Sequence, residues 1–287
     1  MDIISMIDFK GHSLQEKMIL INNGKKYGQI VFLAGGAGSG KGFARDNFME
    51  GEKFKVRDVD EWKKSFLKIA ALKDKYPEIQ GLDLKKPEDV AAMHAFILKK
   101  DIKDRTMRLM ITQMSKKETL PNIMFDMTFN DIKKVKKMMP DLLNAGYNPA
   151  NIHLIWVLQE YNIAIKQNKS RERIVPDDIM FSTHSGAGAT IYELLAGKSK
   201  ELIQLNGSIH VVLNNPKNTI WMAPTGSDRS KAKGGVIKDF KYLTLKQRGK
   251  SIMRELQVMT ELYTWIIKSI PKGELTKAMK KMSSTGK

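Results

Sequence analysis

A glycine-rich segment ending in a lysine follows a short apolar run near the start of the chain, and it restricts the possible fold more than any other feature. Residues 30–34 are all apolar, and residues 35–42 read Gly-Gly-Ala-Gly-Ser-Gly-Lys-Gly. In the order strand, glycine loop and helix, the G-x-x-x-x-G-K pattern surrounds phosphate groups with backbone N–H groups, while the lysine reaches the terminal phosphates. The sequence therefore predicts an α/β fold with a phosphate-binding loop, formed by Gly35, Gly36, Ala37, Gly38, Ser39, Gly40, Lys41, Gly42 and Phe43.

The last position of the loop departs from the usual pattern. Gly42 stands where Ser or Thr normally supplies a hydroxyl ligand to Mg²⁺, and Phe43 follows it. Because Mg²⁺ keeps several waters in protein sites, phosphate oxygens, water and a carboxylate elsewhere in the chain can hold it. The alternative is a loop that binds a nucleotide without catalysing transfer.

Short apolar segments alternate with helical ones between residues 29 and 214. Strands separated by helices indicate a parallel sheet covered on both faces, so we expect a three-layer α/β/α sandwich around a mainly parallel five-stranded sheet. The predicted strands are residues 29–34, 54–57, 123–126, 152–158 and 210–213, and the predicted helices are residues 41–49, 61–73, 87–114, 131–145 and 161–169.

The pattern changes after residue 214, which divides the chain into three parts. Residues 1–28 form an N-terminal extension, residues 29–214 the α/β core, and residues 215–287 a basic C-terminal extension. Within the last part, residues 250–269 carry apolar side chains at three- and four-residue steps and predict an amphipathic helix. Residues 185–189, Ser-Gly-Ala-Gly-Ala, are interpreted as a flexible connector, with a second anion-binding loop as the alternative.

Three carboxylates lie at or just after the carboxyl ends of predicted strands. In an open parallel sheet these strand ends face the ligand crevice. Asp60 is placed to accept a proton from a substrate hydroxyl, and Asp58 to orient it or to hold water on Mg²⁺. The other interpretation of these two is a cap on the helix that follows them. Asp126 ends the third strand and is a candidate Mg²⁺ ligand.

Two arginines follow the helix predicted over residues 161–169. Guanidinium forks match phosphate oxygens bidentately, so Arg171 and Arg173 are candidates for stabilising a transferring phosphoryl group. Lys166 and Lys169 add to this cluster. Pairing with surface carboxylates is the alternative role.

These motifs resemble, in the same order, those of zeta-toxin-type P-loop kinases, and polynucleotide kinases share that core. The resemblance covers about residues 28 to 180. It implies a P-loop kinase fold that uses ATP and Mg²⁺, with Lys41 holding the phosphates, Asp60 as the base and Arg173 as a phosphate clamp. Gly42 departs from the family pattern, and an earlier family arginine appears only as Lys166 or Lys169. Besides the phosphate loop, the matching elements are Asp58-Val59-Asp60, Asp126-Met127-Thr128, Gly146-Tyr147 and Arg173-Ile174-Val175-Pro176.

Positive charge is concentrated in the last fifth of the chain. The formal net charge is +18, and residues 229–287 hold 15 Lys or Arg against 4 Asp or Glu. Such a basic segment indicates a polyanionic partner, with a solvated lysine-rich face as the alternative. The chain has no cysteine, no apolar run of membrane-spanning length and no signal-peptide pattern at its start, which favours a cytoplasmic protein that does not engage a membrane.

Together the features predict an ATP-dependent kinase that transfers the γ-phosphate to a hydroxyl group. The positive charge favours a nucleic acid as acceptor, either a strand end or a hydroxymethylated base in DNA, as in some bacteriophage modification pathways. One alternative is a zeta-toxin-like kinase of a small nucleotide sugar. The other is a non-catalytic NTP-binding switch or nucleic-acid accessory protein, for which Gly42 is the main support.

Overall fold

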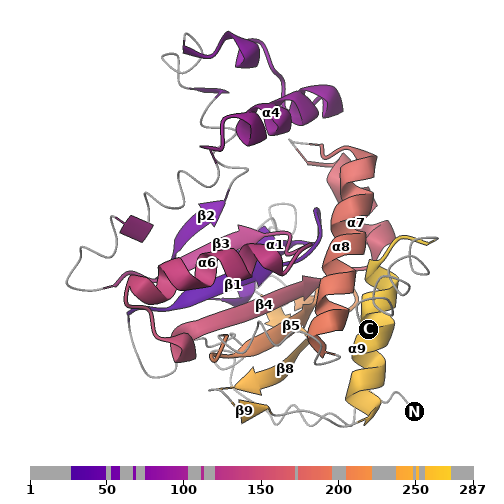
Figure 1. Ribbon diagram of the computed structural model, residues 1–287. Helices are drawn as coiled ribbons and strands as arrows, with labels where there is room; N and C mark the ends of the chain where they lie inside the picture. Colours follow the sequence, from indigo (N-terminus) through magenta and orange to yellow (C-terminus); the bar gives the residue numbers. More distant parts are fainter. Residues whose placement is uncertain are drawn as a thin grey trace, which may run out of the picture.

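Five parallel strands form the centre of the molecule (Figure 1), in the order β2-β3-β1-β4-β5. Their bounds are β1 Ile30–Ala34, β2 Lys55–Asp58, β3 Ile123–Met127, β4 Ile152–Leu158 and β5 Ile209–Leu213. The computed structural model describes residues 27–49, 53–58, 67–68, 75–102, 111–112, 120–171, 174–195, 205–221, 237–247, 250–251 and 256–272.

The segment after residue 214 extends this sheet. β8 (Tyr242–Gln247) pairs antiparallel with β5, and β9 (Lys250–Ser251) pairs with β8, so the sheet has seven strands. β6 (Ile220–Trp221) and β7 (Ile237–Asp239) form a separate two-stranded sheet. The predicted mainly parallel α/β sheet is confirmed, and its strand number is larger than five because the C-terminal segment adds two antiparallel strands.

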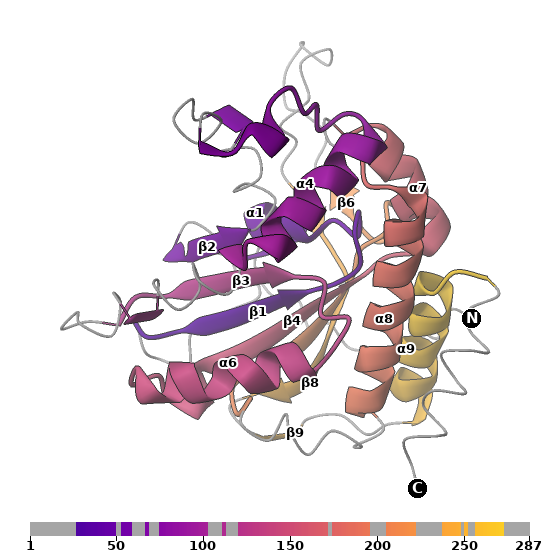
Figure 2. The ribbon, with the colours of Figure 1, turned by 45° about the horizontal axis from the view of Figure 1, so that its top comes forward.

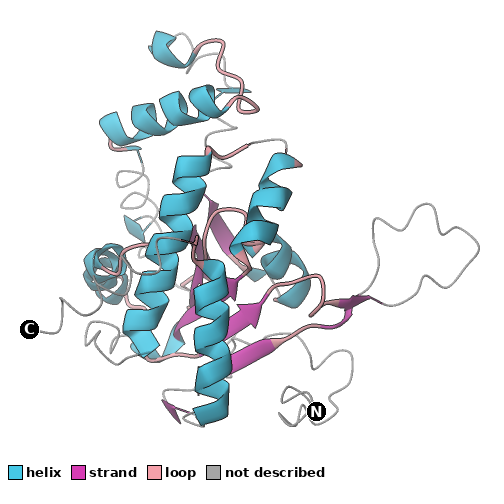
Figure 3. Ribbon diagram, turned by 90° about the vertical axis from the view of Figure 1, so that its right-hand side faces the viewer, coloured by secondary structure: helices cyan, strands magenta, loops and turns pink. Residues whose placement is uncertain are grey.

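Helices cover both faces of the sheet, as Figure 3 shows by colour. Ile30 and Phe32 of β1 pack in one apolar cluster with α6, α8 and α9, whereas Val31 and Leu33 pack in a second cluster with α1. Successive side chains of a strand point to opposite faces, so this division confirms the three layers. The helices are α1 Lys41–Phe48, α4 Pro87–Lys99, α6 Lys133–Asn144, α7 Tyr161–Lys169, α8 Asp177–Leu195 and α9 Leu256–Ser269, with 3₁₀ turns η3 Pro77–Ile79 and η4 Pro149–Asn151.

The interpretation of residues 185–189 as a connector or an anion loop is wrong, because these residues lie inside α8. Their small side chains serve close packing. A Cβ on Gly186 would lie 2.7 Å from Cβ of Asn130, and one on Gly188 would contact Ile270, which follows α9. Tertiary contacts of this kind override the weak helix propensity of glycine.

Two predicted helices have different bounds in the structure. The helix expected over residues 87–114 is interrupted: α4 ends at Lys99, and Asp101 adopts a left-handed backbone conformation with φ 49°. Residues 102, 111 and 112, the described residues of that range beyond Asp101, are helical. The helix expected over residues 250–269 begins at Leu256, and residues 250–251 are β9. Of the helix expected over residues 61–73, only residues 67–68 are described, and both are helical.

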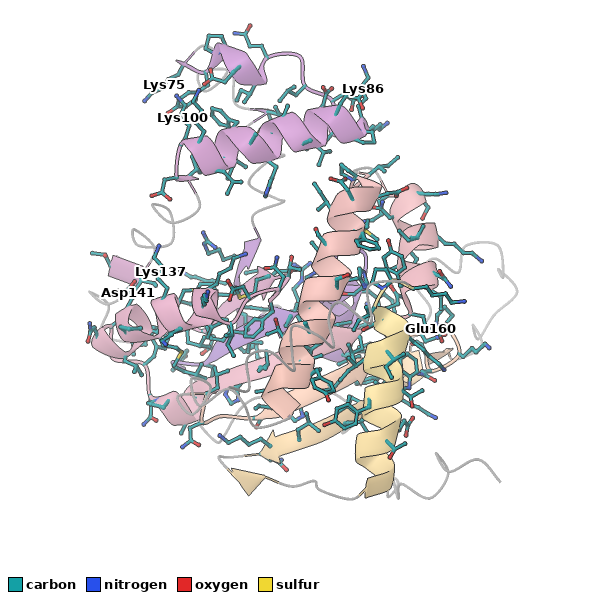
Figure 4. The ribbon with its side chains drawn as sticks, turned by 45° about the vertical axis from the view of Figure 1, so that its right-hand side comes forward. Lys75, Lys86, Lys100, Lys137, Asp141 and Glu160 are labelled. Carbon is teal, nitrogen blue, oxygen red and sulfur yellow. The ribbon has the colours of Figure 1, made fainter. Side chains whose placement is uncertain are left out.

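α4 and η3 form a small apolar cluster of their own, which contains Ile79, Met93, Phe96 and Ile97. In Figure 1 they stand apart from the central sheet, and in Figure 2, with the top turned forward, α4 passes in front of the end of the sheet near α1 and β2. Lys100, labelled in Figure 4, lies 5.4 Å from the centre of the Tyr76 ring.

Candidate nucleotide-binding site

The loop between β1 and α1 has a backbone shape that excludes most side chains. Gly35 has φ 147°, and a Cβ on it would lie 2.6 Å from the carbonyl oxygen of Val157 on β4. Gly40 caps the N-terminus of α1 in a left-handed conformation with φ 85°. The first turn of α1 contains no acidic residue, so its N–H groups and positive dipole end face the loop without a side-chain anion.

Lys41 folds back onto this loop. Its Nζ donates to the carbonyl oxygens of Gly35, at 3.0 Å, and Gly36, at 3.3 Å. Nζ also lies 3.7 Å from Oδ1 of Asp126 on β3, and both side chains are 13% exposed. The lysine is therefore held at the loop by acceptors that a phosphate group can replace.

The predicted carboxylates of β2 and β3 lie at the same edge of the sheet. Asp58 and Asp126 are partners in the parallel register of these neighbouring strands. Carboxylate oxygens at this edge suit Mg²⁺, which takes oxygen ligands and keeps several waters. Within the described part of the chain, no group of three or more His, Asp or Glu could hold a metal by itself. The side chain of Asp58, and all of Asp60 and Arg173, lie outside the described residues.

Three polar side chains that no sequence motif identified form hydrogen bonds with the backbone of the loop. The N–H of Ala37 donates to Oγ1 of Thr183 at 3.3 Å, and Nε2 of His184 lies 2.7 Å from the carbonyl oxygen of Ala37. Nδ2 of Asn214 donates to the carbonyl oxygen of Ser39 at 2.8 Å. Asn214 directly follows β5, so the rule that polar residues at strand carboxyl ends face the site could have identified it. Nothing in the sequence around His184 distinguishes it.

Two further polar side chains lie buried at the carboxyl ends of the central strands. Gln159 follows β4 and is 1% exposed, and Ser39 of the loop is also 1% exposed. Neither the amide atoms of Gln159 nor Oγ of Ser39 has a hydrogen-bond partner among the described residues. Buried polar groups without partners are costly, and they are expected where a ligand completes the bonding. Nδ2 of Asn215, next to Asn214, donates at 3.0 Å to Oε1 of Glu160, and Figure 4 labels Glu160.

Of the other predicted binding residues, Gly42 has open space around a Cβ, with nothing within 4 Å. Phe43 packs edge-on against Phe48, with ring centroids 5.4 Å apart. Arg171 is exposed just after α7, and Lys166 and Lys169 are exposed on its last turns.

The Gly-Tyr element of the family resemblance has a packing role. The Tyr147 ring is buried in the larger apolar cluster, and its hydroxyl donates to the carbonyl oxygen of Pro121 at 2.9 Å. Burial raises the pKa of this phenol above its usual value. Gly146 before it has φ 97° and forms the left-handed end of α6.

The basic C-terminal extension is described in part. Lys246 on β8 donates from Nζ to the carbonyl oxygen of Leu205 at 3.0 Å, and partial burial lowers its pKa. Residues 222–236, 248–249, 252–255 and 273–287, which hold much of the positive charge, lie outside the described residues. Among the described helices, none combines the length and apolar character needed to cross a membrane.

No protein-family model and no curated protein matches this chain. Two chains of solved structures match, one from a complex of AvrRxo1-ORF1 and AvrRxo1-ORF2 with sulphate ions and one from that complex with ATP. Each is 11% identical to this chain, and the match covers 87% of this chain and 67% of the other, with a TM-score of 0.43.

Proposed function

We propose that the protein is an ATP-dependent kinase that transfers the γ-phosphate to a hydroxyl group. The observation that carries this proposal is the position of Lys41, at the start of α1 and between the loop carbonyls and Asp126. This combination of lysine, helix N-terminus and strand-end carboxylate is what phosphoryl transfer requires near the β- and γ-phosphates.

The chain's own groups account for each requirement of the reaction. The triphosphate enters the loop, where it replaces the carbonyl oxygens of Gly35 and Gly36 as the partner of Lys41 and accepts from the N–H groups at the start of α1. Asp126 and Asp58 hold Mg²⁺, which neutralises phosphate charge when it is bound. Asp60 accepts the proton of the acceptor hydroxyl.

The transfer itself balances between acceptor and nucleotide. The acceptor oxygen forms a bond to the γ-phosphorus, the bond from that phosphorus to the bridging oxygen breaks, and ADP leaves with the electron pair. Arg173 and Arg171 stabilise the charge on the phosphoryl group as it moves. These two roles rest on the sequence pattern.

Replacement of Asp60 by asparagine tests catalysis separately from binding. We expect kcat for phosphoryl transfer to fall about 100- to 10,000-fold, because the amide cannot accept the hydroxyl proton. Binding of ATP should stay within about threefold of wild type, measured by calorimetry beside transfer from labelled ATP. Asp141→Asn, on the exposed side of α6 (Figure 4), is the matched control. Equal transfer by Asp60→Asn and wild type would contradict the role of Asp60 as the base, and absence of transfer by wild type would favour the non-catalytic switch.

The charge of the chain favours a nucleic acid as the acceptor, and salt dependence tests this choice. If two phosphates of DNA pair with lysine or arginine, KM for DNA rises about tenfold between 50 and 200 mM salt, because bound counterions are released on association. DNA, RNA, nucleosides and nucleotide sugars are compared with labelled ATP in one assay. Product formed only on a nucleotide sugar, or a KM for DNA that does not change with salt, would contradict the nucleic-acid acceptor.

A further inference from the structure

His184 on α8 connects two segments that are far apart in the chain. Its Nε2 lies 2.7 Å from the carbonyl oxygen of Ala37 in the phosphate loop, and its Nδ1 lies 3.0 Å from the carbonyl oxygen of Ser269 at the end of α9. The ring is 2% exposed. It therefore forms a bridge from the loop to the C-terminal helix.

The surroundings of the ring fix it in this position. A Cβ on Gly36 would lie 2.6 Å from Nε2 of His184, so the backbone of the loop rests directly on the ring. Tyr161 of α7 contacts the ring edge-on, with centroids 5.3 Å apart. Packing from the loop, from α7 and from α9 leaves the ring little freedom to leave the bridge.

We infer that His184 is a positioning residue, which holds the phosphate loop in its nucleotide-binding shape by tying Ala37 to Ser269 on α9. The inference rests on the proposed function for its ligand, since the loop must bind a nucleotide triphosphate. Through this bridge the C-terminal helix α9 becomes part of the nucleotide site.

Both partners of the ring are carbonyl oxygens, which accept and cannot donate. A neutral imidazole has one N–H and satisfies one of them, whereas an imidazolium has two and satisfies both. Burial holds the pKa of His184 below its ordinary value of 6.5; the two carbonyls act in the opposite direction, and Lys41 lowers the pKa further. A bound triphosphate compensates the charge of Lys41 and so raises the pKa.

Because bound triphosphate raises the pKa of His184, protonation of the ring and binding of ATP favour each other. The protonated ring is favoured in the nucleotide complex, so the gain in ATP affinity is present below the pKa of the free protein. The gain is lost as pH rises through the pKa of the complex. Among the described residues, Lys41 of α1 and Tyr161 of α7 are the titratable groups that face the ring. Burial raises the pKa of Tyr161, so it stays neutral over this range.

Amide hydrogen exchange of the nucleotide-free protein tests the bridge without relying on activity. In His184→Gln we expect the amides of residues 36–40 and of residues 269–270 to exchange about fivefold faster together, because one amide side chain cannot reach both carbonyls. ATP binding should weaken about tenfold, and the ratio of wild-type to variant affinity should decrease from pH 5.5 to pH 8. Protonation of ATP itself affects both proteins equally, so it cancels in the ratio of their affinities.

His153→Gln is the matched control. His153 is also fully buried with two partners, since Nε2 lies 2.8 Å from Oε1 of Gln29 and Nδ1 accepts from the N–H of Ser208, but it lies at the amino end of β4. This variant should lower thermal stability and leave exchange at residues 36–40 unchanged.

A second variant breaks the bridge from the opposite side. Gly36→Ala displaces the ring without changing it, and should speed exchange at residues 269–270 on α9, which a defect confined to the loop would not do. Unchanged exchange at both segments in these two variants overturns the inference. If wild type binds no ATP, the proposed function fails, and the exchange data still decide whether the bridge exists.

Discussion

Replacing Lys41 by methionine is expected to lower kcat for phosphoryl transfer about 100- to 1,000-fold, because the site then lacks its positive group at the transferring phosphate. The hydrocarbon stem of methionine fills nearly the same space, so the loop keeps its packing. Transfer from labelled ATP under saturating acceptor measures the loss. Thermal unfolding should change little, since Lys41 Nζ makes only partly exposed contacts with Gly35, Gly36 and Asp126.

Lys99→Met controls for the general effect of removing a lysine. Lys99 is exposed in the last turn of α4, remote in sequence from the loop, and its loss should change the free energy of unfolding by less than about 0.5 kcal/mol. Retention of more than half of the wild-type rate in Lys41→Met would contradict the assignment of the phosphate site to this loop.

Replacing Gly35 by alanine is expected to weaken nucleotide binding about tenfold to a hundredfold. Its φ of 147° costs a residue with a Cβ about 1–3 kcal/mol, and every 1.4 kcal/mol corresponds to a factor of ten. The new methyl group would also lie 2.6 Å from a backbone carbonyl of Val157, which cannot move as a flexible side chain can. Calorimetric titration with ATP measures the change.

Gly42→Ala provides the matched glycine-to-alanine change seven residues later in the chain. Gly42 is helical and has open space around a Cβ, so alanine there should keep nucleotide affinity and stabilise the helix by up to about 1 kcal/mol. Equal affinities for Gly35→Ala and Gly42→Ala would show that the shape of the loop at Gly35 is not required.

Four of the five parallel strands could be predicted from the sequence because β1, β3, β4 and β5 are short, mainly apolar runs followed by glycine or a polar residue. The segment 152–158 has the same bounds in prediction and structure, and β1 and β5 differ from their predicted ranges by one residue at the start. The loop motif was equally clear, because residue type, spacing and flanking elements all agree. A strand that is buried on both faces is nearly continuous in apolar residues, so its position can be predicted from the local sequence.

α8 could not be predicted, because its glycines are poor helix formers and only tertiary packing explains them. Gly186 is placed against Asn130, and Gly188 against Ile270, so the relevant information lies in distant parts of the chain. For the same reason no local pattern indicated that His184 is a partner of the loop. The predicted roles of Asp60 and Arg173 stay predictions, since both residues lie outside the described part of the structure.

The hydrogen bonds that hold the phosphate loop determine when it can form during synthesis. Ala37 bonds to residues 146 and 147 positions further along the chain, and Ser39 to one 175 positions further. Closing such long segments is slow, because chain entropy is lost before the contacts form. A nascent chain that has emerged from the ribosome only as far as β4 therefore has the whole glycine motif but not yet the partners that shape it. The loop reaches its folded shape late in translation.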